Sequence, residues 1–229
     1  MNRQELKKQL ELLNIKNVDE LESLMDDTLT TNEKFNLTAI TDKEKFRELM
    51  ILDSLIPLSF YDFNNKKVLD IGTGAGYPGL PLAISSSGKF TLLDSTKKKI
   101  DHINEYVKEH NTYNVKGVNA RAEEFVKSHR EEFDIVIARA VSSLNILLEL
   151  AIPFVKVGGV FIAMKGSKGK EELDESKKAL KLLDSEVLSI NESKLPESGE
   201  ERINIVIRKN KVTNIKYPRE YKDIVNKPL

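Results

Sequence analysis

Four glycines within eight residues give this sequence its clearest chemical signature. They lie in the stretch DIGTGAGYPG, residues 70–79, which follows the apolar residues Val68 and Leu69. Glycines between a strand and a helix permit positive φ angles and let backbone N–H groups approach a ligand closely. The stretch therefore predicts a nucleotide-binding loop, and the residues around it indicate which nucleotide it binds.

Two common nucleotide sites fit this loop poorly. A triphosphate-binding P-loop needs Lys followed by Ser or Thr after its last glycine, whereas Tyr77 and Pro78 follow Gly76. A dinucleotide fingerprint G-x-G-x-x-G that starts at Gly72 fails at Tyr77. One that starts at Gly74 matches in letters, but it puts Pro78 in the turn that should hold a pyrophosphate. An NAD-dependent oxidoreductase is therefore a distant alternative.

The loop matches a class I S-adenosylmethionine site, D-x-G-x-G-x-G, at every position. Asp70, Gly72, Gly74 and Gly76 supply the pattern. A carboxylate at the end of the first strand suits a ligand that carries an ammonium and a sulfonium. Asp94 ends the next apolar run, where a second acid would hold ribose hydroxyls. We therefore predict S-adenosylmethionine as the cofactor, bound by these five residues.

These residues require a sheet with helices on its faces, and the rest of the chain predicts one. From residue 66 onward, short apolar runs alternate with amphipathic segments, which is typical of parallel strands covered by helices. The expected strands are 67–71, 90–94, 115–118, 134–138 and 160–165, and the expected helices are 79–86, 97–110, 122–128, 143–155 and 170–183.

The end of the chain indicates which kind of α/β fold this is. Two further strands, 186–193 and 202–208, have no helix between them and should therefore pair antiparallel. Such a final hairpin is typical of methyltransferases and not of NAD domains. We predict an α/β, Rossmann-like class I methyltransferase domain over residues 66–229, preceded by a small helical region over residues 1–65, where apolar stripes have helical spacing.

Composition indicates a protein of the cytoplasm. The chain has no cysteine, three histidines and no apolar run near the 20 or so residues that span a bilayer. We therefore expect no membrane segment and no metal centre, and we expect a monomer. The net charge is zero, but residues 1–65 hold 8 Lys/Arg against 13 Asp/Glu, whereas residues 202–229 hold 8 against 2. The basic tail is the part that could meet nucleic acid.

Several collinear motifs resemble one known family. They are VLDIGTGAGYPGLPLAI, NLTAITD followed by LDSL, AEEF, ARAVSSL, a KG pair after the fifth strand, and the terminal YPRE and KPL. Together they are similar to the 16S ribosomal RNA guanine-N7 methyltransferases, also called the glucose-inhibited division protein B family. The resemblance implies a class I enzyme that methylates N7 of one guanine in the small ribosomal subunit. Gly72 and Tyr77 would line the cofactor, Asp94 would take its ribose, and Ala122 and Glu123 would flank its adenine.

Arg139 is the residue that we expect to act on the substrate. It follows the strand FDIVIA at the ligand edge of the sheet, where enzymes that methylate exocyclic amines carry an N/D-P-P-Y/F motif that this chain lacks. Guanine N7 has a lone pair and no proton, so its methylation needs alignment and no general base. Arg139 would contact the guanine, an RNA phosphate or the cofactor carboxylate. The alternative is an ion pair with an acid such as Asp94.

Basic residues at the same edge and in the tail are the predicted RNA contacts. Lys165 ends the fifth strand and begins a loop expected to be mobile and basic. With Arg139, the predicted set comprises Lys165, Lys168, Lys170, Arg208 and Arg219. Lysines 97–99 are interpreted as a solvated charge run, and Glu123 could equally be a solvated helix residue. Two alternative functions remain: a methyltransferase for another substrate, or a non-catalytic module that binds S-adenosylmethionine or RNA.

Overall fold

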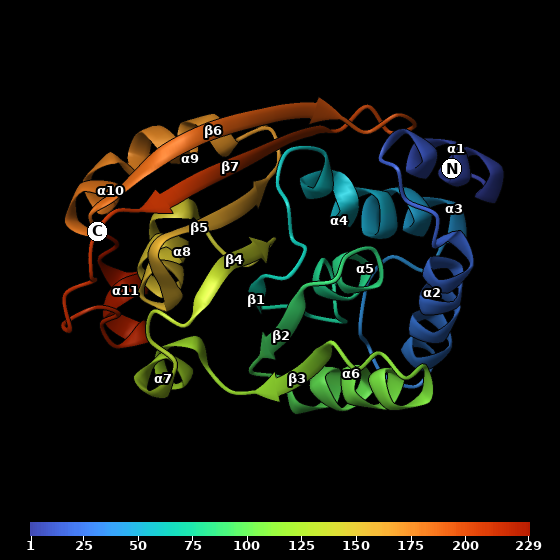
Figure 1. The fold of residues 1–229 in the computed structure, drawn as a ribbon, viewed down its shortest axis with the longest axis horizontal. Helices are drawn as coiled ribbons and strands as arrows, with labels where there is room; N and C mark the ends of the chain where they lie inside the picture. Colours follow the sequence, from blue (N-terminus) through green and yellow to red (C-terminus); the bar gives the residue numbers. More distant parts are fainter.

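A seven-stranded sheet forms the centre of the computed structural model, which describes residues 1–229 (Figure 1). Its strand order is β3-β2-β1-β4-β5-β7-β6. The first five strands are mutually parallel, and β7 runs antiparallel to both β5 and β6. The strands are β1 (Lys67–Ile71), β2 (Lys89–Asp94), β3 (Val115–Asn119), β4 (Phe133–Arg139), β5 (Val155–Lys165), β6 (Ser185–Lys194) and β7 (Glu201–Lys209). The predicted fold class and its antiparallel hairpin are confirmed.

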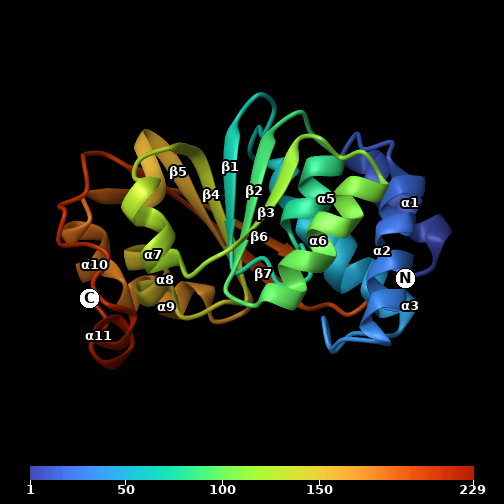
Figure 2. The ribbon, with the colours of Figure 1, turned by 90° about the horizontal axis from the view of Figure 1, so that it is seen from below.

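Helices cover both faces of this sheet (Figure 2). On one face lie α5 (Gly79–Ile84), α6 (Lys97–Glu109) and the N-terminal helices α1 (Arg3–Leu12), α2 (Val18–Asn32), α3 (Lys43–Phe46) and α4 (Asp53–Leu55). On the other lie α7 (Ala122–Phe125), α8 (Leu144–Ala151), α9 (Gly169–Glu175), α10 (Lys177–Leu182) and α11 (Tyr221–Asn226). Because both faces are covered, the central strands β4 and β5 contain continuous buried apolar runs rather than alternating apolar and polar residues.

Successive residues of the central strands enter two separate cores. In β4, Ile135 and Ile137 pack with the N-terminal helices, α5 and α6, whereas Val136 and Ala138 pack with α8 and α10. The first core also includes Leu6, Leu21 and other residues of the N-terminal helices. The helical region that precedes the sheet therefore buries its apolar stripes directly against the sheet.

Two predicted helix boundaries were wrong. The helix expected over residues 143–155 ends at Ala151, and a 3₁₀ turn with Pro153 leads into β5 five residues earlier than predicted. Proline lacks the N–H that would continue the helix, and the strand contains a register shift before Val160. The helix expected over 170–183 is divided at Ser176, whose buried hydroxyl donates to the Glu172 carbonyl at 2.7 Å.

The helical region contains one irregular turn. Residues Arg47–Leu52 form a π-helical turn between α3 and α4. A 3₁₀ turn at Ile56–Ser59 follows α4. The N–H of Asp53 donates to the Glu48 carbonyl, whereas in an α-helix it would donate to the Leu49 carbonyl. This shift leaves the Leu49 carbonyl free for a contact outside its own helix.

Candidate active site

Two adjoining clefts open at the carboxyl edge of the parallel strands. The wide cleft has a volume of about 750 Å³ and the narrow cleft one of about 340 Å³. Both are lined by Gly72, Lys99, Ala140 and Val141, so they meet between the glycine loop and the segment after β4. This is the edge at which open α/β sheets bind ligands, as the sequence predicts.

The glycine loop makes the floor where the clefts meet. Gly72 has φ +69° and Gly74 has φ +61°, a region that disfavours side chains. A Cβ on Gly72 would lie 2.6 Å from Cγ2 of Val141, whereas one on Gly74 would meet nothing within 4 Å. Gly76 also has a positive φ, but its missing side chain makes room for Leu80 and Ile103. Gly72 and Gly74 therefore face the clefts, and Gly76 serves packing.

Asp70 does not lie where the sequence predicts. It is fully buried beneath the loop and lines neither cleft. Its Oδ2 accepts from the Thr73 hydroxyl at 2.6 Å and from the Gly79 N–H at 2.9 Å, while its Oδ1 has no partner. Burial raises the pKa of Asp70 to about 6. Direct cofactor contact by Asp70 therefore stays a prediction; in the structure its side chain ties the loop to the start of α5.

Asp94 does lie in the narrow cleft. Its Oδ2 accepts from the Gly74 N–H at 3.0 Å, and its Oδ1 accepts from the Thr96 N–H at 2.8 Å. Each carboxylate oxygen can accept more than one hydrogen bond, so both keep capacity for a vicinal pair of hydroxyls. The geometry is compatible with the predicted ribose contact. The ion pair with Arg139 that the sequence left open is not made by Asp94.

Ala122 and Glu123 also line the narrow cleft. Glu123 pairs with Arg121, and that guanidinium lies 4.7 Å from the ring centroid of Tyr221. Tyr221 begins α11 and also lines this cleft, a role that the sequence analysis missed. The C-terminal segment therefore reaches the predicted adenosine side of the site.

Tyr77 lines the wide cleft but points its hydroxyl away from solvent. The ring is 3% exposed and packs edge-on against Phe46, and the hydroxyl lies 3.0 Å from that of Thr28. Burial raises the pKa of Tyr77 well above its usual range, so the phenol stays neutral. Tyr77 can therefore contact a ligand through its ring, but it cannot act as a base.

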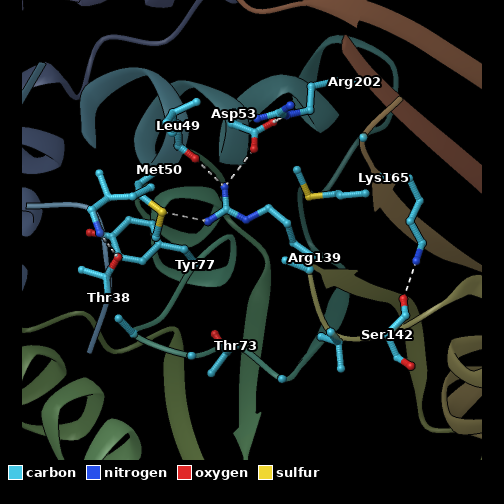
Figure 3. A pocket seen from close by; sticks show the side chains of 18 of the residues that line it. Thr38, Leu49, Met50, Asp53, Thr73, Tyr77, Arg139, Ser142, Lys165 and Arg202 are labelled. Carbon is cyan, nitrogen blue, oxygen red and sulfur yellow. Dashed lines mark hydrogen bonds and ion pairs between the residues drawn. The ribbon is translucent and has the colours of Figure 1, made fainter. Parts of the chain in front are cut away.

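Arg139 reaches across the wide cleft to the helical region (Figure 3). Its Nη1 donates to the Leu49 carbonyl at 3.0 Å and to Asp53 Oδ2 at 3.1 Å, and its Nη2 lies 3.5 Å from Sδ of Met50. The π-helical turn supplies the first of these acceptors. Asp53 is shared, because its Oδ1 accepts from Nε of Arg202 at 2.9 Å. Arg139 thus forms an ion pair with an acid, as the alternative interpretation predicts, but the acid is Asp53 and not Asp94.

The same turn is fixed from its other side by the β6–β7 hairpin. Glu48 is buried, and its Oε1 accepts from the backbone N–H groups of Glu197 at 2.6 Å and Ser198 at 3.1 Å. Neither Glu48 nor Asp53 was given a role from sequence, although Asp53 lies in the LDSL motif, because both belong to a helical segment. The wall that holds Arg139 is therefore built jointly by the N-terminal region and the hairpin.

Lys165 is not part of a mobile loop. Its side chain is 7% exposed, and its Nζ lies 2.8 Å from Oε2 of Glu172 and donates to the Ser142 carbonyl (Figure 3). Glu172 also accepts from the Leu144 N–H at 2.8 Å. Lys165 lines the wide cleft, but it acts there as a clamp on the segment after β4.

The other predicted RNA contacts are dispersed. Lys168 is exposed beside the cleft, and Lys170, also exposed, lies 2.7 Å from Glu192. Arg208 pairs with Glu186 and lies opposite Val160, about 17 Å along the strand from the cleft edge. Arg219 makes a bidentate ion pair with Glu149, which is fully buried. Arg208 and Arg219 therefore fit structural roles better than RNA contact.

Lys99 is a cation of the clefts whose position was not predicted from the sequence. It lines both clefts, and it takes part in none of the protein's ion pairs, whereas Lys97 pairs with Asp101 in the next helical turn. Its position could have been inferred, since the first turn of a helix that follows a parallel strand lies at the ligand edge. Lysines 97–99 are thus not all ordinary solvated residues.

The clefts fit a molecule of the predicted cofactor's shape. A nucleoside would lie in the narrow cleft near Asp94. Its amino-acid chain would cross Gly72 and Gly74 into the wide cleft, because backbone without side chains leaves room there.

None of the helices combines the length and apolar content needed to cross a bilayer. Nowhere do three or more His, Asp or Glu side chains gather as metal ligands would.

Known proteins share both the sequence and the fold. The chain matches the family described as rRNA small subunit methyltransferase G over residues 17–203. It is 43% identical over 215 residues to the Ribosomal RNA small subunit methyltransferase G of Fusobacterium nucleatum, covering 93% of this chain and 90% of the relative. The Clostridium tetani protein of the same name is 40% identical over 202 residues, covering 86% and 84%.

Solved structures with low identity share the fold. M. jannaschii TYW2, solved in complex with AdoMet, has a TM-score of 0.59 at 18% identity, covering 75% of this chain and 79% of that one. An O-methyltransferase from Bacillus cereus, in complex with SAH, has a TM-score of 0.57 at 18% identity, covering 82% and 91%. The fold is that of class I methyltransferases. With the sequence matches, it confirms the resemblance carried by the motifs: the chain belongs to the rRNA small subunit methyltransferase G family.

Proposed function

We propose that this protein transfers the methyl group of S-adenosylmethionine to N7 of one guanine in 16S ribosomal RNA. Family membership supports the reaction class and the ribosomal substrate. The observation that carries the choice of N7 is the absence of a free base on the wall of the wide cleft. No histidine lines it, and its carboxylates, Asp53, Glu172 and Glu200, are each held in an ion pair.

That wall suits attack by a nitrogen that has a lone pair and no proton to lose. S-adenosylmethionine supplies an electrophilic methyl group when bound. Glycine-loop backbone and Asp94 would bind and orient it, with Ala122, Glu123 and Tyr221 around its nucleoside. The guanine would enter the wide cleft, where Arg139, held by Asp53 and the Leu49 carbonyl, can donate to an acceptor on the base or to a phosphate.

The proposal also includes the oligomeric state, the metal requirement and the location of the enzyme. We expect the enzyme to work as a monomer, and the proposed chemistry requires no metal. The proposed substrate is made in the cytoplasm, so we expect the protein there. Within the clefts, the cofactor contacts of Gly72, Gly74, Asp94, Ala122 and Glu123 are part of this proposal.

The test compares methylation in cells and with purified enzyme. A deletion strain should lack one 7-methylguanosine in 16S RNA, measured by mass spectrometry of the digested RNA, and the wild-type gene should restore it. Arg139→Ala should not restore it, whereas Arg208→Ala, a matched arginine outside the clefts, should. An unchanged 7-methylguanosine content in the deletion strain refutes the proposal. Cofactor binding by calorimetry without transfer to small subunits would indicate a non-catalytic module instead.

A further inference from the structure

A third hollow adjoins the wide cleft, and neither the cofactor nor the target base occupies it in the proposal above. Its volume is about 360 Å³. It lies between the loop after α2 and the first turn of α6, and Leu37 and Lys99 line both this hollow and the wide cleft. We call it the rim hollow; its lining comprises Asn32, Glu33, Lys34, Phe35, Asn36, Leu37, Thr96, Lys98 and Lys99.

Phe35 is an aromatic side chain left 43% exposed on the wall of this hollow. The ammonium of Lys98 lies 5.3 Å from its ring centroid, a cation–π contact. The loop that carries Phe35 is built firmly: Oδ1 of Asn32 accepts from the N–H groups of Leu37 at 2.7 Å and Thr38 at 2.9 Å. The loop is thus fixed, and it holds the Phe35 ring in solvent rather than in the core.

The cations around this ring are free to meet a ligand. Lys34, Lys98 and Lys99 take part in none of the protein's ion pairs, and Glu33 is the only acid in the lining. An exposed aromatic ring with unpaired cations beside it is the combination with which proteins bind single-stranded nucleic acid. The ring stacks on a base, and the ammonium groups contact the flanking phosphates.

We propose that the rim hollow binds the nucleotide next to the methylated guanine, with its base stacked on Phe35 and its phosphates beside Lys98 and Lys99. This inference rests on the proposed function, since it takes ribosomal RNA as the occupant. Continuity with the wide cleft argues for a neighbouring nucleotide of the same strand. The NLTAITD motif, residues 36–42, begins directly after Phe35, and its first two residues, Asn36 and Leu37, line the rim hollow.

A fluorescent reporter tests the stacking directly. The chain contains no tryptophan, so a Phe35→Trp variant would have a single one at the rim. Stacking on a base should quench its emission when a hexaribonucleotide of adenosine is added, while the abasic ribose-phosphate hexamer should leave it nearly unchanged. Tyr113→Trp, at a residue 87% exposed in the loop after α6, is the matched control and should respond to neither. Equal responses of the Phe35→Trp variant to both hexamers, or no response to either, overturn the proposal.

Kinetics with purified small subunits separate this inference from the proposed function. Wild-type transfer in the same assay establishes the function. Phe35→Leu, which keeps apolar bulk but removes the π face, should then raise KM for the subunit about tenfold, with kcat and the affinity for S-adenosylhomocysteine unchanged. Phe35→Tyr should restore the wild-type KM. Lys98→Ala should raise KM more than Lys108→Ala does, and the rise should shrink as salt increases. An active wild type with an unchanged KM in Phe35→Leu overturns the rim hollow alone.

Discussion

Replacing Asp70 with asparagine tests whether this carboxylate serves the loop or the cofactor. Oδ2 of Asp70 accepts from Thr73 and Gly79, and an amide oxygen can accept the same two bonds. Oδ1 is buried without a partner, so an amide nitrogen there would also lack one. The free energy of unfolding of Asp70→Asn should therefore differ from that of the wild type by two contributions. One is a constant that does not depend on pH, and the other comes from the ionisation of Asp70 and does depend on pH.

The magnitude follows from the pKa of that group. In the fold it is raised to about 6, against an ordinary value of 3.8. Because the folded state holds the proton more tightly, wild-type stability is full below the unfolded pKa and falls as pH rises through the interval between the two values. At about 1.4 kcal/mol per pKa unit the full effect is about 3 kcal/mol. The wild type should lose about 2.4 kcal/mol of it relative to Asp70→Asn between pH 4 and pH 7, because the unfolded carboxyl is already more than half ionised at pH 4.

Urea unfolding of both proteins from pH 4 to pH 8, at constant ionic strength, measures this difference. The other titrating groups are common to both proteins and cancel in the comparison. A difference in unfolding free energy that stays constant across this range refutes the burial argument. Calorimetry at pH 7.5 gives the second result: affinity for S-adenosylhomocysteine should change less than twofold, whereas a loss of more than tenfold would return Asp70 to the cofactor contacts.

Three further substitutions test the walls of the clefts. Gly72→Ala should abolish binding of S-adenosylhomocysteine, because its Cβ would lie 2.6 Å from Val141 Cγ2 at φ +69°, and adding Val141→Ala should restore part of the affinity; calorimetry that shows no recovery refutes this clash as the cause. Asp53→Asn should lower kcat at least tenfold through Arg139 while leaving the affinity for S-adenosylhomocysteine intact, and unchanged turnover on small subunits would contradict its positioning role. Tyr221→Ala should raise the Kd for S-adenosylhomocysteine about fivefold while Tyr221→Phe does not, and an unaltered Kd in the alanine variant would remove α11 from the site.

Local patterns predicted the sheet well because strand and helix periods are short-range properties. β1 begins and ends as expected, and the other parallel strands differ by a residue or two at their ends, apart from β5. Val155 in β5 was predicted to end a helix, since Gly158 and Gly159 interrupt the apolar run and hide the continuous strand. Boundaries that depend on tertiary pairing were the ones missed.

The site was predicted in part for the same reason. Gly72, Asp94 and Arg139 could be found because each ends a strand or follows one, and strand ends share one edge. Asp53 could not be found, because its contacts with Arg139 and Arg202 join residues 86 and 149 positions apart in the chain. The charges of the C-terminal segment were misread because a count of lysines and arginines does not reveal a buried partner such as Glu149.

The bond between Glu48 and the tip of the β6–β7 hairpin has a consequence for biosynthesis. It joins residues 149 and 150 positions apart, and Arg202 on the same hairpin completes the ion pairs of Asp53. During translation the glycine loop and its neighbouring strands emerge long before this hairpin. The substrate wall can therefore close only after residue 202 has been synthesised, and Tyr221 completes the nucleoside cleft later still.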